Sequence, residues 1–295
     1  MGFDVQCVKF LLGAQRNGVR FTRTAVLGRQ QLFIKPTSLR RLLRDAGMVM
    51  SEAAVRETLT ADPGFAEPLL RLLGAEEICS VDASPYEGAT IVHDFNQPVP
   101  SHLVNAFSVV IDAGTLEHIF DFPRAIRNCM EMVREGGHLL LITPTNNFMG
   151  HGFYQFSPEL FFRVCSEANG FAINRIIVCE VDPGAPWYQV VDPARAGRRV
   201  ELVTSRPAYL LVEAAKLRHV PVLTSAPQQS DYTVLWQEPR REHEASRVRP
   251  TLPERVLRGV TRRLGGAYRR IEPAALAARR LRPDGEVFIE VNWHP

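Results

Sequence analysis

The sequence predicts an α/β protein with a doubly wound, mostly parallel sheet. Strand-like segments alternate with helical ones along the chain, and this alternation implies right-handed crossovers between parallel strands. The runs FSVVIDAG at 107–114 and HLLLITPT at 138–145 are largely apolar, as is typical of parallel strands that are covered on both faces. Glycine or aspartate ends several of these runs, at the edge where such sheets bind ligands.

The individual elements follow from apolar periodicity and from glycine and proline punctuation. Helices are expected over 5–16, 39–47, 51–60, 65–73, 122–137 and 158–169. Strands are expected at 24–28, 77–84, 89–95, 107–114, 138–145, 172–181, 207–214 and 286–293. Residues 216–235 are expected to form either further strands or a closing flap.

We divide the chain into three parts: a helical N-terminal extension over 1–23, the α/β domain over 24–215, and a C-terminal extension over 216–295. Between Glu238 and Arg282 the last part has thirteen arginines and five glutamates, a net charge of +8, whereas the whole chain carries +3. The sequence therefore predicts a basic extension on a mildly acidic body.

Within this extension, residues 253–271 place apolar side chains at helical spacing between arginines. Three interpretations remain open for this basic amphipathic helix. It packs on the domain by its apolar stripe, it contacts anionic lipid at a membrane surface, or it binds RNA. Nucleic acid is the weakest of the three, because aromatic residues for base stacking are sparse.

The whole-chain composition excludes several classes. The five cysteines are odd in number and have no CxxC spacing, which favours buried thiols in a reducing compartment over disulfides or zinc. No segment approaches the roughly 20 apolar residues of a membrane span, and the N-terminus lacks the pattern of a secretory signal. We expect a cytoplasmic protein, which would be peripheral to a membrane if residues 253–271 bind lipid.

Four candidate binding residues end predicted strands. Gly28 follows the first strand, Asp82 the second, Asp94 the third and Asp112 the fourth. The carboxyl ends of parallel strands meet at one edge of a sheet, so these residues are expected to line one crevice.

The stretch 107–171 resembles class I S-adenosylmethionine (SAM)-dependent methyltransferases of the small-molecule type. The matching elements are the strand ending in Asp112, then Leu116-Glu117-His118-Ile119 before a helix, and Val133-Arg134-Glu135-Gly136-Gly137 leading into the next strand. Phe156-Ser157-Pro158 then begins another helix, and Gly170-Phe171 precedes a strand. The resemblance covers about residues 24–215 and implies a Rossmann-like fold with SAM as the cofactor.

The resemblance also implies roles for the strand-end residues. Asp82 corresponds to the acid that accepts hydrogen bonds from the SAM ribose, and Asp94 to the polar residue near the adenine amino group. The glycine-rich loop of the family is reduced here to Gly28, followed by Arg29. Arg29 is expected either to pair with the carboxylate of SAM or to be a structural arginine in a chain that no longer binds SAM.

Methyl transfer to a hydroxyl needs an aligned acceptor and a group that takes its proton. His118 and His151 are candidate bases, because a neutral imidazole suits this task near pH 7, and Glu117 is a candidate for substrate contact. No metal is expected, because the sequence shows no cluster of carboxylates and histidines with ligand spacing.

The sequence thus predicts a SAM-dependent methyltransferase that acts on a small molecule or a glycan, with oxygen as the expected acceptor atom. Two alternatives stay open. The altered glycine loop is compatible with a catalytically inactive scaffold or binding protein, and the basic C-terminal segment with an RNA-modifying methyltransferase.

Overall fold

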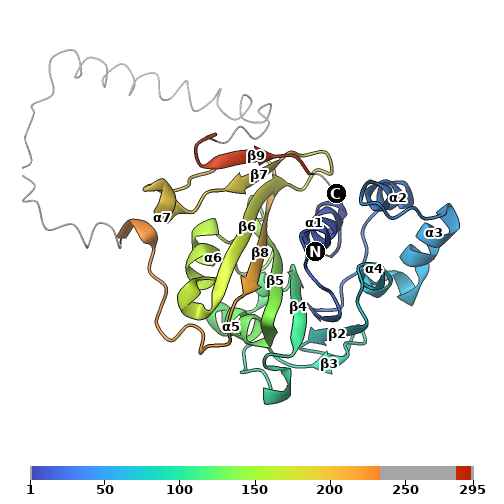
Figure 1. Ribbon diagram of the computed structural model, residues 1–295, viewed down its shortest axis with the longest axis horizontal. Coiled ribbons are helices and arrows are strands. Elements are labelled where there is room, and N and C mark those ends of the chain that lie inside the picture. The colour runs from blue at the N-terminus through green and yellow to red at the C-terminus, as the bar shows by residue number, and fades with distance from the viewer. Residues whose placement is uncertain (1, 233–283, 294–295) are drawn as a thin grey trace, which may run out of the picture.

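The computed structural model describes residues 2–232 and 284–293. These residues form one sheet in the order β3-β2-β1-β4-β5-β8-β6-β7-β9 (Figure 1). The strands are β1 (Arg23–Leu27), β2 (Glu77–Asp82), β3 (Ile91–Val92), β4 (Phe107–Ala113), β5 (Val133–Asn146), β6 (Phe171–Glu180), β7 (Trp187–Val190), β8 (Ala208–Lys216) and β9 (Phe288–Val291).

The predicted doubly wound, mostly parallel sheet is confirmed. Strands β3, β2, β1, β4 and β5 pair in parallel, in the order that begins a dinucleotide-binding sheet, 3-2-1-4-5. Strand β8 lies between β5 and β6 and runs antiparallel to both. Strands β7 and β9 extend the sheet by further antiparallel pairs. The order reverses between β1 and β4, so the loops after these two strands border the crevice of the sheet.

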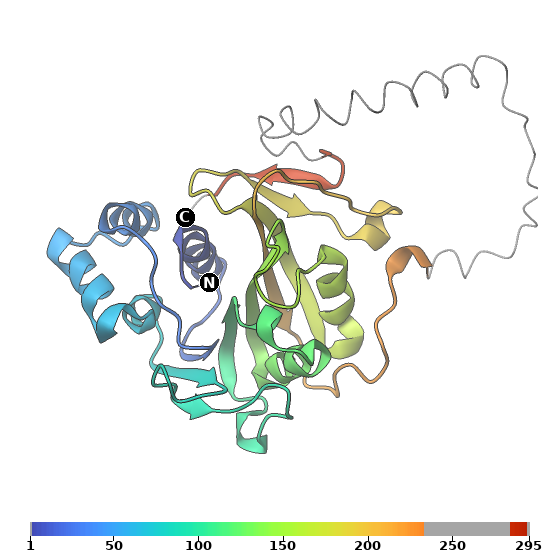
Figure 2. The same cartoon turned by 180° about the vertical axis from the view of Figure 1, so that it is seen from behind.

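Helices cover both faces of the sheet, and Figures 1 and 2 show the two layers from opposite sides. Helices α5 and α6 lie on one face, and α1 on the other, with α2, α3 and α4 beyond it. The α-helices are α1 (Val5–Arg16), α2 (Pro36–Asp45), α3 (Glu52–Thr60), α4 (Glu67–Leu72), α5 (Phe122–Met132), α6 (Pro158–Val164) and α7 (Pro193–Ala196). The short 3-10 helices are η1 (Asp62–Gly64), η2 (Ser101–Leu103), η3 (Leu116–His118) and η4 (Glu167–Asn169).

Each face of the sheet has its own apolar core. Side chains of β4 alternate between the two: Val110 packs with α5, whereas Val109 and Ile111 pack with α1. The N-terminal segment belongs to the second core, since Phe3 and Leu11 are fully buried there. Helix α1, within the N-terminal extension expected over 1–23, packs its apolar face against the sheet.

One predicted boundary differs from the structure for an identifiable reason. The helix expected over 122–137 ends at Met132, and β5 begins at Val133 without a loop. The buried ammonium group of Lys216 donates to the carbonyls of Met130 and Val133, so it satisfies backbone acceptors that the abrupt helix end leaves free. Residues 217–225 form no strand.

The predicted C-terminal strand is confirmed as β9, which pairs with β7. The basic amphipathic helix expected over 253–271 lies outside the described residues. In the described part of the chain, no helix has the length and apolarity that a membrane span requires.

Candidate active site at the carboxyl ends of the parallel strands

Gly28 ends β1 at the point where the strand order reverses, and its φ of +66° is one that favours glycine. Its N–H donates to the carbonyl of Val81 in β2. A Cβ at this position would lie 3.1 Å from Nε2 of Gln30, 3.2 Å from Oγ1 of Thr115 and 3.7 Å from Oδ2 of Asp82. The glycine is therefore surrounded by polar atoms from three loops of the sheet edge.

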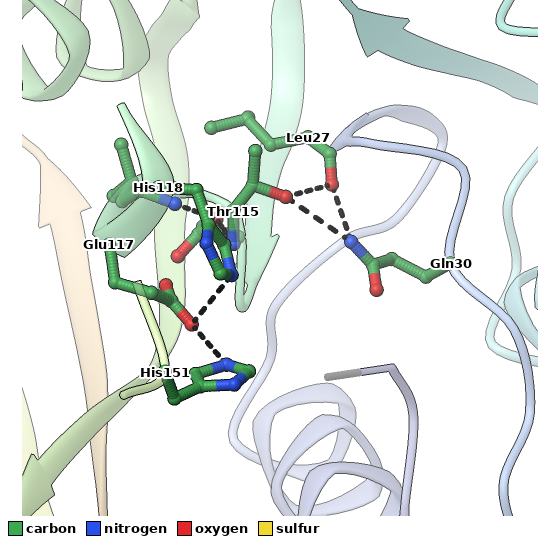
Figure 3. Close-up of polar contacts among 8 residues, drawn as sticks. Leu27, Gln30, Thr115, Glu117, His118 and His151 are labelled. Atoms are coloured by element: carbon green, nitrogen blue, oxygen red, sulfur yellow. Dashed lines mark hydrogen bonds and ion pairs between the residues drawn. The ribbon is translucent and has the colours of Figure 1, made fainter. Parts of the chain in front are cut away.

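The Gln30 side chain covers this glycine. Its amide nitrogen donates to the carbonyl of Leu27 at 2.7 Å and lies 3.4 Å from Oγ1 of Thr115, and Figure 3 shows it turned back over the end of β1. The hydroxyl of Thr115 donates to the same carbonyl. The sequence prediction named neither Gln30 nor Thr115 as a site residue, and only their approach to Gly28 in space identifies them.

Arg29 does not face this space. Its Nε donates to Glu67 at 2.6 Å and its Nη1 to the carbonyl of Glu87. Its guanidinium carbon lies 4.0 Å from the centroid of the Phe65 ring. The expectation that Arg29 pairs with the carboxylate of SAM is therefore corrected: the guanidinium is held between α4 and the loop after β2.

Asp82 lies at the end of β2, as predicted, and remains partly exposed. Its Oδ1 accepts a hydrogen bond from the N–H of Ser84, and among the described residues its Oδ2 receives none. This second oxygen points to the Gly28 side of the edge, so it is available to accept from a ligand hydroxyl.

Asp94 is exposed and follows the short strand β3. Its Oδ1 accepts from both the backbone N–H and the side-chain amide of Asn96, which is the pattern of a turn-forming aspartate. These bonds lower the pKa of Asp94. The structure thus gives Asp94 a turn-forming role, and contact with a cofactor stays a prediction.

Asp112 is fully buried at the end of β4. Its Oδ1 accepts from the N–H groups of Thr115 and Leu116, so it shapes the turn that leads into η3. The prediction that Asp112 binds the cofactor directly is wrong for this structure, because no part of the side chain is accessible. Burial raises the pKa of Asp112 to about 7.

Glu117, His118 and His151 come together beside this turn. Oε1 of Glu117 lies 3.2 Å from Nε2 of His151 and 4.0 Å from Nε2 of His118. The two imidazole rings are in edge contact, with centroids 5.0 Å apart. Figure 3 shows both rings turned toward the same carboxylate oxygen. The three predicted acceptor-site residues therefore form one cluster.

The loop after β5 delivers His151 to this cluster. The N–H groups of Phe153 and Tyr154 donate to the carbonyl of Glu117, which fixes the loop against η3. Gly152 links His151 to these contacts with a φ of +77°, and a Cβ there would come within 2.7 Å of the same carbonyl oxygen. The close approach requires glycine.

Burial dominates the electrostatics of the cluster. Glu117 is fully buried, and burial, with a smaller effect of the Asp112 charge, raises its pKa to about 8. Burial also lowers the pKa of His118 and of His151, so both imidazoles are neutral near pH 7.

Exposed aromatic side chains flank the cluster, although the sequence analysis did not name them. Phe120 and Phe153 are 73% and 66% exposed, and their rings form an edge contact with centroids 5.9 Å apart. Each lies two residues after a histidine of the cluster. Their exposure creates an apolar rim beside a polar centre.

No protein-family model matches this sequence, and no curated protein does. Solved structures with similar architecture include a SAM-dependent methyltransferase of Thermotoga maritima, a possible histamine N-methyltransferase, at 12% identity and a TM-score of 0.37; 71% of this chain and 89% of that chain are covered. The 1,6-didemethyltoxoflavin N1-methyltransferase of Burkholderia thailandensis, solved with 1,6-didemethyltoxoflavin and S-adenosylhomocysteine, shows 13% identity and a TM-score of 0.37, covering 72% and 78%.

The branched-chain polyamine synthase of Thermus thermophilus, in complex with N4-aminopropylspermidine and 5′-methylthioadenosine, shows 14% identity and a TM-score of 0.39, covering 78% of this chain and 62% of that chain. Similarity at this distance concerns general architecture alone. By the order and direction of its own strands, the chain has a Rossmann-like, doubly wound α/β fold.

Proposed function

We propose that the protein is a SAM-dependent methyltransferase that acts on a small-molecule acceptor at the carboxyl edge of its sheet. The observation that supports this most directly is one juxtaposition. Gly28 and the free Oδ2 of Asp82 lie at the strand-order reversal. Thr115, in the turn after β4, donates to Leu27 at the end of β1, and the same turn carries Glu117 and His118, which His151 joins from the loop after β5.

The residues at this edge fit one end of SAM as they stand. Oδ2 of Asp82 is free to accept hydrogen bonds from ribose hydroxyls, and Gly28 presents backbone without a side chain. The other end is covered by the Gln30 side chain, which in the described part of the chain forms hydrogen bonds to Leu27 and Thr115. Rotation of this flexible side chain would open the space for the methionine part.

When bound, SAM would supply an activated methyl group. The chain's own residues would then orient the acceptor and receive its proton. Neutral His118 and His151 suit a proton acceptor near pH 7, and the exposed rings of Phe120 and Phe153 suit an acceptor that has an apolar part. We further propose oxygen as the acceptor atom, since a hydroxyl needs such a base.

A non-catalytic binding protein is the second candidate, and the cover over Gly28 favours it. If Gln30 and the Arg29–Glu67 pair hold the loop closed permanently, neither SAM nor its product binds. Affinity for the product therefore separates the two candidates.

Isothermal titration calorimetry with S-adenosylhomocysteine tests the proposal. We expect micromolar binding by the full chain, and a loss of about tenfold to 100-fold in Asp82→Asn, because a hydrogen bond to a charged group contributes about 1.5–3 kcal/mol. Asp45→Asn is a matched control, since Asp45 lies at the end of α2 and pairs with Arg44. Absence of binding by the folded, unmodified chain would favour the non-catalytic candidate.

A further inference from the structure

The cluster of Glu117, His118 and His151 has a second property besides its place in the crevice. Each residue offers one ligand atom, and the three atoms all lie within 4.8 Å of one another. Two come from the η3 turn and the third from the loop after β5. Separation along the chain conceals this grouping, which is why no metal was expected from the sequence.

Hydrogen bonding does not account for the grouping. Glu117 is fully buried, yet neither of its carboxylate oxygens has a hydrogen-bond partner among the described residues. Nε2 of His151 is also buried without such a partner, although it lies 3.2 Å from Oε1 of Glu117. Burying a carboxyl group without a hydrogen-bond partner costs free energy. The arrangement therefore suits a ligand that accepts electron pairs from oxygen and nitrogen.

The surroundings supply a further unpartnered acceptor oxygen and no competing cation. Oδ2 of the buried Asp112, on the strand that leads into the turn, likewise lacks a hydrogen-bond partner in the described part of the chain. No lysine or arginine of that part makes an ion pair with Glu117. A cation is therefore the ligand that this pocket of acceptor atoms would stabilise most.

We propose that Glu117, His118 and His151 bind a divalent first-row transition-metal ion of the zinc type. Two imidazoles with one carboxylate are a ligand set typical of such ions, whereas magnesium and calcium prefer oxygen ligands. The site itself does not depend on SAM binding. Its bearing on catalysis rests on the proposed function: with zinc bound, His118 and His151 would hold the ion, and the ion as a Lewis acid would take over from the imidazoles the activation of the acceptor hydroxyl.

The distances allow this coordination with a small adjustment. Ligand atoms about 2.0–2.2 Å from a tetrahedral zinc ion lie about 3.3–3.6 Å apart. The pair formed by Glu117 and His151, at 3.2 Å, is already close to this spacing. His118 must approach Glu117 by less than 1 Å from its present 4.0 Å, and its side chain, 47% exposed, has room to turn. Three protein ligands leave at least one coordination position for water or an acceptor oxygen.

Calorimetric titration of the chelator-treated, full-length chain with zinc chloride tests the site, without SAM or its product present. We expect one ion per chain, and visible absorption bands of a coordinated ion when cobalt replaces zinc. Thiolate competition is small, because all five cysteines are buried. Glu117→Gln and His151→Asn each should weaken zinc binding by about tenfold or more, since loss of even an outer partner of a ligand costs that much.

His118→Ala should fold like the natural chain, because this ring is half-exposed, and it should also weaken zinc binding. His102→Ala, which removes an exposed imidazole from η2, should leave zinc affinity unchanged. Failure of the folded chain to bind zinc, or affinity that survives all three ligand substitutions, would overturn the site. A magnesium affinity above that for zinc would overturn the proposed ligand class.

Discussion

Gly152 lies in backbone contact with Glu117. The position of a Cβ on Gly152 would be 2.7 Å from the carbonyl oxygen of Glu117 and 2.9 Å from its Cγ. This contact joins the loop after β5 to the turn after β4, and through it His151 reaches the buried carboxyl group.

Gly152→Ala should therefore separate the two loops. The positive φ costs an alanine about 1–3 kcal/mol, and the clash with fixed backbone about 1–3 kcal/mol more. Urea unfolding should show a loss of about 2–6 kcal/mol, and zinc affinity should fall with it. Gly150→Ala is the matched control, because its φ of +84° carries the same strain while no atom lies within 4 Å of the added methyl group. Equal losses in both variants would refute the role of the contact.

Gln30→Ala should strengthen the binding of S-adenosylhomocysteine. The side chain must give up its hydrogen bonds to Leu27 and Thr115 before the methionine part can enter, and one such bond is worth about 1 kcal/mol. Calorimetry should show affinity higher by about three- to tenfold. Gln97→Ala, at an exposed position, should not change it. Weaker binding in Gln30→Ala would instead mean that Gln30 contacts the cofactor.

Arg29 is expected to act on stability. Its pair with Glu67 is largely shielded, with side-chain exposures of 22% and 16%, and it stacks on Phe65. A double-mutant cycle with Arg29→Met and Glu67→Gln should give a coupling free energy of unfolding of about 1–2 kcal/mol. The affinity of the folded Arg29→Met variant for S-adenosylhomocysteine should differ from that of the natural chain by less than about threefold. A large specific loss of affinity in Arg29→Met alone would restore Arg29 as a cofactor ligand.

Lys216 gives the protein a predictable dependence on pH. Burial lowers its pKa to about 8 from an ordinary 10.5, so the unfolded chain binds this proton more tightly than the folded one. As the pH rises between about 8 and 10.5, Lys216 therefore increases the free energy of unfolding, by at most about 1.4 kcal/mol per pH unit. This stabilisation is lost as the pH falls through about 8.

Lys216→Met removes that titration together with two hydrogen bonds to the end of α5. Urea unfolding at pH 7.5, 8.5 and 9.5 should show that Lys216→Met is less stable than the natural chain, with a difference that widens as the pH rises. Comparing Lys216→Met with the natural chain at the same pH cancels the effect of other titrating groups, such as the buried thiols. A difference that narrows toward pH 9.5 would contradict the direction assigned to the lysine.

The doubly wound fold could be predicted from the sequence because apolar runs mark buried strands and because glycine or aspartate marks where several of them end. Strand β4 is an example: its seven residues are all buried, as is typical of a parallel strand that is covered on both faces of the sheet. Strand β7, Trp187–Val190, was missed, since four residues at the sheet margin carry too little periodicity to predict.

The site was predictable in its members but less so in their roles. Glu117, His118 and His151 were named, yet only the fold shows that they share one space. For Arg29 the sequence left a cofactor contact and a structural role open, because its partner Glu67 comes from α4 and no local pattern reveals that contact. Asp112 was misassigned because a strand-end aspartate can face inward, to cap the next turn, as readily as outward.

The outer margin of the sheet depends on the last described segment of the chain. Strand β9 covers β7 along four residue pairs, and Trp293 donates to the carbonyl of Lys9 in α1. A version cut short before Phe288 would expose the free backbone groups of β7 as an open strand, a surface prone to self-association. Affinity tags and truncations intended to improve expression are therefore better placed elsewhere than immediately before this strand.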